Sequence, residues 1–234
     1  MIPETFSLMQ NHAVIDLPAE TRFGHLARSF PRRRFVEVLK VPETLRIHTG
    51  LHVLIAANGS GKTTLMRTLA GLQPAVVGGI AVRGPVLYFA DDLSFAPELN
   101  ARQVFSSLLP RNQASFARAL AELLRLDLGK PYRELSRGNR QKISLILAET
   151  HAEHGQGGLI LQDESLAGLD PPTRRVIFSL WEQKRQSRCR IIALHETEAL
   201  QRVDSVLSIQ AGELRQHEPR SPEELRQLCE SLTR

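Results

Sequence analysis

Cysteines, long apolar runs and internal repeats are scarce or missing in this chain of 234 residues. Its two cysteines, Cys189 and Cys229, form no metal-ligand spacing and no disulfide framework, which indicates a reducing, cytosolic compartment. No window approaches eighteen consecutive apolar residues, so the sequence predicts no transmembrane helix. The N-terminal residues lack the basic start and apolar core of a secretory signal. The composition is otherwise that of a soluble globular protein, with 42% hydrophobic and 24% charged residues.

The net charge of +5 does not predict a nucleic-acid partner, because the basic residues are spread along the chain. The one short basic run is Arg32-Arg33-Arg34. We interpret it first as a solvated turn. The alternatives are a contact with a partner or with membrane headgroups, and a place near a bound nucleotide.

A glycine-rich segment, residues 56–64, lies between an apolar run and a helical pattern. This order predicts a strand, a glycine loop and a helix. In such a unit the backbone N–H groups of the loop point at phosphate oxygens, and the helix N-terminus adds a partial positive charge. Lys62 would reach the β- and γ-phosphates, and the hydroxyl of Thr63 would ligate Mg²⁺. Ala56 stands where the motif has glycine, and we expect it to be tolerated. The predicted nucleotide-binding residues are Asn58, Gly59, Ser60, Gly61, Lys62, Thr63 and Thr64.

Short apolar strands alternate with helical patterns along most of the chain, which predicts an α/β fold. We expect a phosphate-loop NTPase type of architecture, with a largely parallel central sheet flanked by helices. A small antiparallel β part is predicted within the first fifty residues. One domain spans residues 1–234, with a helical subdomain at about 100–150, broken at Pro110, and a C-terminal helix at about 221–234.

Two further apolar strands end in polar side chains, Asp163-Glu164 and His195. Ligands of such sheets bind beyond the carboxyl ends of the strands, so these groups should meet the glycine loop. Asp163 would hold Mg²⁺, directly or through water. Glu164 would deprotonate the attacking water, and His195 would contact the γ-phosphate region.

These motifs together resemble those of ATP-binding cassette (ABC) ATPases over about residues 45–212. The glycine loop is similar to the family's Walker A motif, and residues 159–164 are similar to Walker B with its catalytic glutamate. Residues 135–142 resemble the L-S-G-G-Q signature, residues 167–170 the D-loop with Asp170, and His195 the switch histidine. The five motifs stand in the family's order.

The resemblance implies an ATPase that binds ATP and Mg²⁺ and works as a head-to-tail dimer. Lys62, Glu164 and His195 would be its catalytic residues. The signature of one subunit would close over the nucleotide of the other through Ser136, Arg137, Gly138 and Asn139. It further implies integral-membrane transporter subunits as partners, and a cytoplasmic location on the inner face of the cell membrane.

Several positions depart from the family pattern. Asp91 stands where the Q-loop glutamine is usual and could reach Mg²⁺ through water. Arg137 and Asn139 replace the second glycine and the glutamine of the signature. An aromatic residue upstream of Walker A usually stacks on the nucleobase, and Phe30 and Phe35 are the candidates here.

We therefore expect the ATPase subunit of a membrane transporter. The segment 140–142 resembles exporter-type cassettes. One alternative is an ABC ATPase without a transport role. Another is a slow regulatory cassette that pairs with a different ABC subunit, for which Asp91 is the motivating residue. Whether the dimer is a homodimer or a heterodimer stays open.

Overall fold

An eight-stranded sheet forms the centre of the computed structural model, which describes residues 14–27, 34–90, 93–155, 158–166, 168–194 and 202–233. The strands lie in the order β2-β3-β11-β10-β5-β9-β8-β7. In chain order they are β2 Arg22–Ala27, β3 Arg34–Lys40, β5 Gly50–Ala56, β7 Val86–Phe89, β8 Leu159–Asp163, β9 Cys189–Ala193, β10 Ser205–Gln210 and β11 Glu213–His217.

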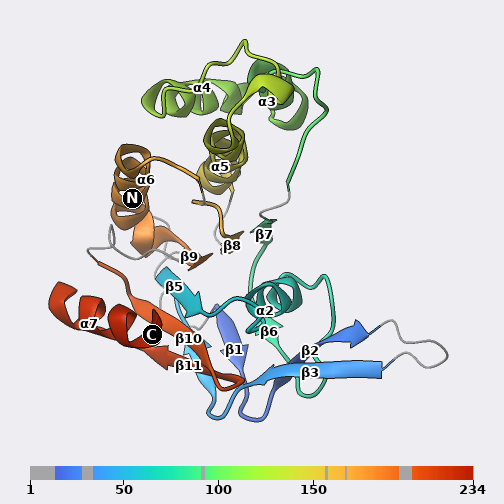
Figure 1. Cartoon of the computed structure of the whole chain (residues 1–234), viewed down its shortest axis with the longest axis vertical. Helices are drawn as coiled ribbons and strands as arrows, with labels where there is room; N and C mark the ends of the chain where they lie inside the picture. Colours follow the sequence, from blue (N-terminus) through green and yellow to red (C-terminus); the bar gives the residue numbers. More distant parts are fainter. Residues whose placement is uncertain are drawn as a thin grey trace, which may run out of the picture.

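The half of this sheet that carries the predicted motifs is parallel. β10, β5, β9, β8 and β7 pair in parallel, and β5 and β8 are buried at every residue. Parallel strands covered on both faces are expected to be continuous apolar runs, as they are here. The sheet brings the carboxyl ends of β5 and β8 to the same edge, with β9 between them (Figure 1).

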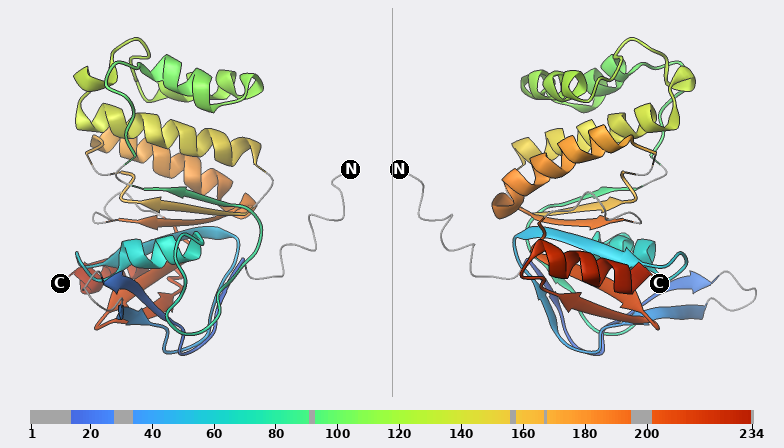
Figure 2. Two further views of the ribbon diagram at one scale, coloured as in Figure 1. Left: turned by 90° about the vertical axis from the view of Figure 1, so that its right-hand side faces the viewer. Right: turned by 60° about the vertical axis from the view of Figure 1, so that its left-hand side comes forward.

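Helices cover both faces of the parallel strands. Figure 2 shows α5 (Arg137–His154) and α6 (Pro171–Lys184) side by side over one face, with α2 (Lys62–Leu69) on the other. Because successive strand residues point to opposite faces, β5 contributes to two hydrophobic cores. Val53 packs into the α5 and α6 core, whereas Leu54 packs with Leu65 of α2.

A second, antiparallel sheet of three short strands lies beside α2. Its order is β4-β1-β6, with β1 Ile15–Leu17, β4 Leu45–Ile47 and β6 Ala81–Val82. The predicted α/β fold with a small antiparallel part is therefore confirmed.

The first part of the predicted helical subdomain, residues 101–123 (the helical segment), lies above α5 and α6 in Figure 1 and breaks at Pro110 as expected. Asn100 begins it with a capping box, in which its side chain accepts from the backbone N–H of Gln103 and the Gln103 side chain accepts in return. No helix within the described ranges is long and apolar enough to cross a bilayer. The elements are α3 Ala101–Leu108, η1 Arg111–Gln113, α4 Ala114–Leu123, η2 Tyr132–Glu134, and, near the C-terminus, η3 Arg185–Ser187 and α7 Pro222–Thr233.

The hairpin of β10 and β11 was not predicted from the sequence, although it lies in the middle of the sheet. Its turn is Ala211-Gly212, with φ of 50° and 75°. Alanine is uncommon at a positive φ, and Asn-Gly or Asp-Gly is the usual signal for such a turn. β2 was also missed; it pairs with β3 through a bulge between Phe23 and Gly24.

Candidate functional site

The glycine loop connects β5 directly to α2, as the sequence predicts. Gly61 caps α2 with a φ of 107°, a conformation that glycine adopts without strain. A Cβ atom at Gly61 would also lie 2.7 Å from side-chain carbons of Val38 and Leu39. Glycine is therefore required here both by the backbone and by the close approach of β3.

Ala56 is the last residue of β5 and does not have a positive φ. The substitution of the motif's first glycine is thus unstrained, in agreement with the tolerance expected for it. The Ala56 carbonyl accepts a hydrogen bond from Lys62 Nζ at 3.0 Å, and the Ala57 carbonyl accepts a second bond from the same Nζ at 3.1 Å.

Lys62 is the first residue of α2 and is buried. Burial lowers the pKa of its ammonium, because the charged form loses water, while the carboxylates of Glu164 and Asp163 act in the opposite direction. The lysine therefore places a positive charge within the field of both predicted acids.

Thr63 joins the glycine-loop helix to the strand of the acid pair. Its Oγ1 donates a hydrogen bond to Asp163 Oδ2 at 2.7 Å, across 100 residues of sequence. Asp163 points toward α2 because alternate residues of β8 face opposite sides of the sheet. A hydroxyl and a carboxylate are hard oxygen ligands of the kind that Mg²⁺ takes alongside phosphate and water. These two groups therefore fit a Mg²⁺ ion bound with a nucleotide.

Glu164 follows β8 and lines a cavity of about 270 Å³. Its φ is 51°, a left-handed conformation that costs a non-glycine residue about 1–3 kcal/mol and is concentrated at functional sites. The described residues that line the cavity come from β3, the glycine loop, α2 and the end of β8. They are Val38, Asn58, Gly59, Gly61, Lys62, Thr63, Thr64 and Glu164.

The signature segment opens α5 as predicted. Ser136 caps the helix and accepts a hydrogen bond from the Asn139 N–H at 3.2 Å. Arg140 fixes the preceding turn by donating to the carbonyls of Tyr132 and Arg133. Arg137 is exposed, so its guanidinium faces away from the core. None of the signature residues is among those that line the cavity.

Gly138 brings the signature against the D-loop of the same chain. A Cβ atom at this position would lie 2.5 Å from the carbonyl oxygen of Gly168, so a larger residue would force the two segments apart. The stem of Arg137 also lies over Gly168. The signature and the D-loop are therefore in direct contact.

Asp170 ends the D-loop and caps α6. Its Oδ1 accepts from the Thr173 N–H at 2.8 Å and its Oδ2 from the Thr173 hydroxyl at 2.9 Å. The Thr173 N–H lowers the pKa of this carboxyl most, and Lys142 of α5, 3.9 Å away, lowers it further. Pro171 and Pro172 lack N–H groups, so Thr173 presents the first donor of the helix that needs a partner.

Replacing Asp170 by alanine should destabilise the protein by roughly 1 kcal/mol, because the α6 cap is lost. Asp170→Asn is the matched variant, since it keeps an accepting oxygen but loses the charge. The lowered pKa stabilises the fold above the unfolded-state pKa of the carboxyl, and this contribution is lost as the pH falls through the folded-state value. Urea denaturation should therefore show a wild-type advantage over Asp170→Asn that disappears in acid; equal stabilities for all three proteins would contradict the capping assignment.

Some predicted residues lie outside the described part of the chain: Asp91, the switch residue His195, Ala167 of the D-loop and the nucleobase candidate Phe30. Of Phe35 only the backbone is described, in β3. Val38 was not among the residues predicted for the site, yet β3 places it on the cavity wall next to Gly61.

Comparison with known proteins identifies the family. Residues 44–167, more than half of the chain, match the protein family described as ABC transporter. The chain belongs to this family. The resemblance to the ABC family that its motifs predicted is therefore confirmed.

Similar ABC proteins come from archaea and bacteria. The ABC transporter ATP-binding protein MJ1023 of Methanocaldococcus jannaschii is 27% identical over 169 residues, which cover 68% of this chain and 63% of that protein. The molybdenum import ATP-binding protein ModC of Albidiferax ferrireducens is 29% identical, with 73% of this chain and 52% of ModC covered. The aliphatic sulfonates import ATP-binding protein SsuB 1 of Pseudomonas syringae is 29% identical, with 90% and 77% covered. The chain thus spans about half to two thirds of the first two relatives.

A solved ABC structure has the same fold. The ATP-binding cassette MJ0796, in a dimeric post-hydrolysis state bound to ADP and Pi, aligns with a TM-score of 0.70 over 88% of this ABC chain and 99% of its own. The two sequences are 16% identical, so this likeness concerns the fold.

Proposed function

We propose that this ABC chain binds and hydrolyses ATP and thereby powers a membrane transporter. The observation that supports this most is the 2.7 Å hydrogen bond from Thr63 to Asp163, beside a cavity lined by Lys62 and Glu164. In this proposal these residues grip phosphate, hold a metal and activate water at one place.

In this proposal each residue has a separate task. Backbone N–H groups of the loop and the N-terminus of α2 hold the phosphates, and Lys62 exchanges its loop carbonyl partners for phosphate oxygens. Thr63 and Asp163 would hold Mg²⁺, which would neutralise negative charge on the phosphates. Glu164 takes a proton from the water that attacks the γ-phosphate.

We further propose that two ABC subunits close head to tail around the nucleotide. Ser136 and the backbone N–H groups near Gly138 lie at the N-terminus of α5, an anion-binding arrangement. No signature residue is among the described residues that line the cavity, and in this proposal the anion site meets the nucleotide of a second subunit. The dimeric state of MJ0796 is consistent with this arrangement.

The proposed transport direction is import. The relatives whose names state a direction include import proteins for molybdenum and aliphatic sulfonates, and import proteins for ribose from Burkholderia. The expectation of an exporter-type cassette, which rested on residues 140–142, has no support among these relatives. Because these relatives import different substrates, they do not indicate which cargo this protein serves.

The membrane partner would dock on the helical segment and hold the protein at the membrane surface. Leu108 and Leu123 end α3 and α4 and are 50% and 55% exposed, so two large apolar side chains face outward from this segment. Leu72, 66% exposed after α2, lies outside it.

Serine at both Leu108 and Leu123 should therefore abolish copurification with membrane subunits from detergent-solubilised membranes. ATP binding should remain normal, since neither leucine lines the cavity. Leu72→Ser is the matched control and should leave copurification unchanged. Normal recovery of the partner with the double variant would rule out this docking surface, and loss with Leu72→Ser would point to a general surface effect.

The same preparation separates the alternative functions. A cassette without a transport role should copurify with no integral-membrane protein. A regulatory cassette should show no ATP turnover as a purified homodimer and gain it when a second ABC subunit is added.

A further inference from the structure

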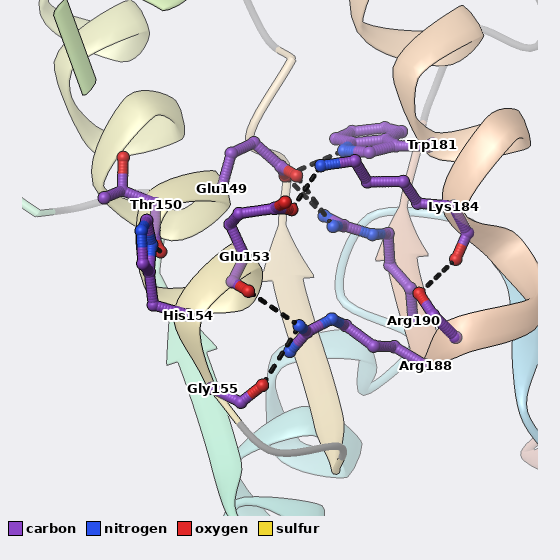
Figure 3. A network of polar contacts seen from close by, with 10 residues as sticks. Glu149, Thr150, Glu153, His154, Gly155, Trp181, Lys184, Arg188 and Arg190 are labelled. Carbon is purple, nitrogen blue, oxygen red and sulfur yellow. Dashed lines mark hydrogen bonds and ion pairs between the residues drawn. The ribbon is translucent and has the colours of Figure 1, made fainter. Parts of the chain in front are cut away.

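A buried charged network lies on the sheet face opposite to Asp163. Arg190, the second residue of β9, is 6% exposed. Its Nη1 and Nη2 donate to the two carboxylate oxygens of Glu149 at 2.6 and 2.9 Å, and Nη1 also donates to Gln162 Oε1. The indole N–H of Trp181 donates to Glu149 at 2.8 Å, and the guanidinium lies 4.9 Å from the Trp181 ring centroid (Figure 3).

The four residues come from four elements: α5, β8, α6 and β9. Taking two ions out of water is costly, and well-packed apolar residues often stabilise a core as well or better. Stability therefore gives no special reason for a network here. A bidentate arginine–carboxylate pair instead fixes the relative position of the elements that carry the two side chains.

One end of the network is next to the acid pair. Gln162 immediately precedes Asp163, and the two side chains leave β8 on opposite faces. Asp163 hydrogen-bonds to Thr63 on the α2 side, while Gln162 is held by Arg190 on the α5 and α6 side. The network thus fixes the strand whose end presents Asp163 and Glu164.

The other end of the network is on the signature helix. Glu149 lies on α5, about 20 Å along the helix axis from the N-cap Ser136. Further contacts fasten the same end of α5: Lys184 of α6 pairs with Glu153, and Arg188 donates to the Glu153 and Gly155 carbonyls at 3.3 and 3.1 Å (Figure 3).

We propose that Arg190 is a positioning residue for ATP hydrolysis, which couples the signature helix to the strand of the acid pair through Glu149 and Gln162. The proposal rests on the proposed ATPase function. When the signature engages a nucleotide, α5 transmits its position to Gln162 and so sets Asp163 and Glu164 against the phosphate and the metal. Trp181 closes the network from α6.

The test replaces the network by apolar residues of similar size. The variant Glu149→Leu, Gln162→Met, Arg190→Met should fold, because no unpaired buried charge is left and only the neutral indole N–H of Trp181 loses its acceptor. Its nucleotide affinity should stay within about threefold of wild type, since Lys62 and the loop are untouched, but kcat should fall by at least about tenfold. The Mg²⁺ concentration for half-maximal turnover should rise, because Asp163 is less well positioned.

Gln162→Met is the second variant. If the triple variant fails to fold, it still tests whether the network positions the acid pair for hydrolysis. Gln162 Nε2 has no hydrogen-bond partner among the described residues. The substitution therefore removes one side-chain hydrogen bond, the one that Gln162 Oε1 accepts from Arg190. It should lower kcat and raise the Mg²⁺ requirement in the same direction, with a nearly unchanged melting temperature.

Ser205→Ala is the matched control. It breaks an equally buried polar contact, the 2.8 Å bond between Ser205 Oγ and His52 Nδ1, which joins β10 to β5 and does not involve β8. It should leave kcat and the Mg²⁺ dependence unchanged.

Wild-type kcat and Mg²⁺ dependence in a folded network variant would overturn the proposal. So would losses that follow melting temperature alone and occur equally with Ser205→Ala. A wild-type protein without turnover would instead overturn the proposed function, so the two failures are distinguishable.

Discussion

A Glu164→Gln variant should bind ATP with near wild-type affinity, lose turnover by at least about a hundredfold, and accumulate as a dimer. Glutamine has the size of glutamate and can occupy the same left-handed position, so the cavity should keep its shape. It cannot take a proton from water. Hydrolysis would then stop at the step that reopens the proposed dimer, and the ATP-bound state would persist.

The measurement combines phosphate release with light scattering, each with and without MgATP. Glu122→Gln is a suitable control, because Glu122 is an exposed carboxylate of α4 outside the cavity. It should hydrolyse normally and show no trapped dimer. Normal turnover of Glu164→Gln would show that another group is the general base, and a monomer at saturating ATP would contradict the head-to-tail arrangement.

Lys62→Ala should abolish turnover and weaken ATP binding by about a hundredfold or more, because a buried charged hydrogen-bond donor to phosphate is lost. The lysine also holds the loop through the Ala56 and Ala57 carbonyls, so the empty loop should become less ordered. Asp163 and Glu164 would then lack the nearby cation that now opposes their charge.

Calorimetric titration with ATP and Mg²⁺ measures this loss directly. Arg67→Ala is the matched control, since it removes a positive charge from the exposed side of the same helix. It should leave affinity within about twofold, because an exposed charge is screened by salt and water. If the two variants weakened binding equally, the general positive potential of α2, and not Lys62 itself, would hold the phosphates.

The glycine loop, the acid pair and the signature could be predicted because each is a continuous stretch whose local conformation carries its chemistry. Thr63 and Asp163 are 100 residues apart, yet parallel strands that end at one edge made their meeting predictable. The roles assigned to Asp91 and His195 stay predictions.

The network of Arg190 could not be predicted in the same way. An arginine within an apolar strand and a glutamate within an apolar helix signal that each needs a partner. Nothing in the pattern says that these two, 41 residues apart, are each other's partners, because that depends on how α5 crosses β9. Val38 was missed for a related reason, since its place on the cavity wall is set by the pairing of β3 with distant strands.

The strand that carries the glycine loop has neighbours encoded much later in the chain. β5 lies between β9 and β10, and neither exists until most of the polypeptide has been made. During synthesis the apolar β5 therefore has two unpaired edges, a state prone to aggregation. A ribosome-bound chain should gain affinity for ATP only after residue 210 has left the exit tunnel, and products truncated before Ser205 should be insoluble and not merely inactive.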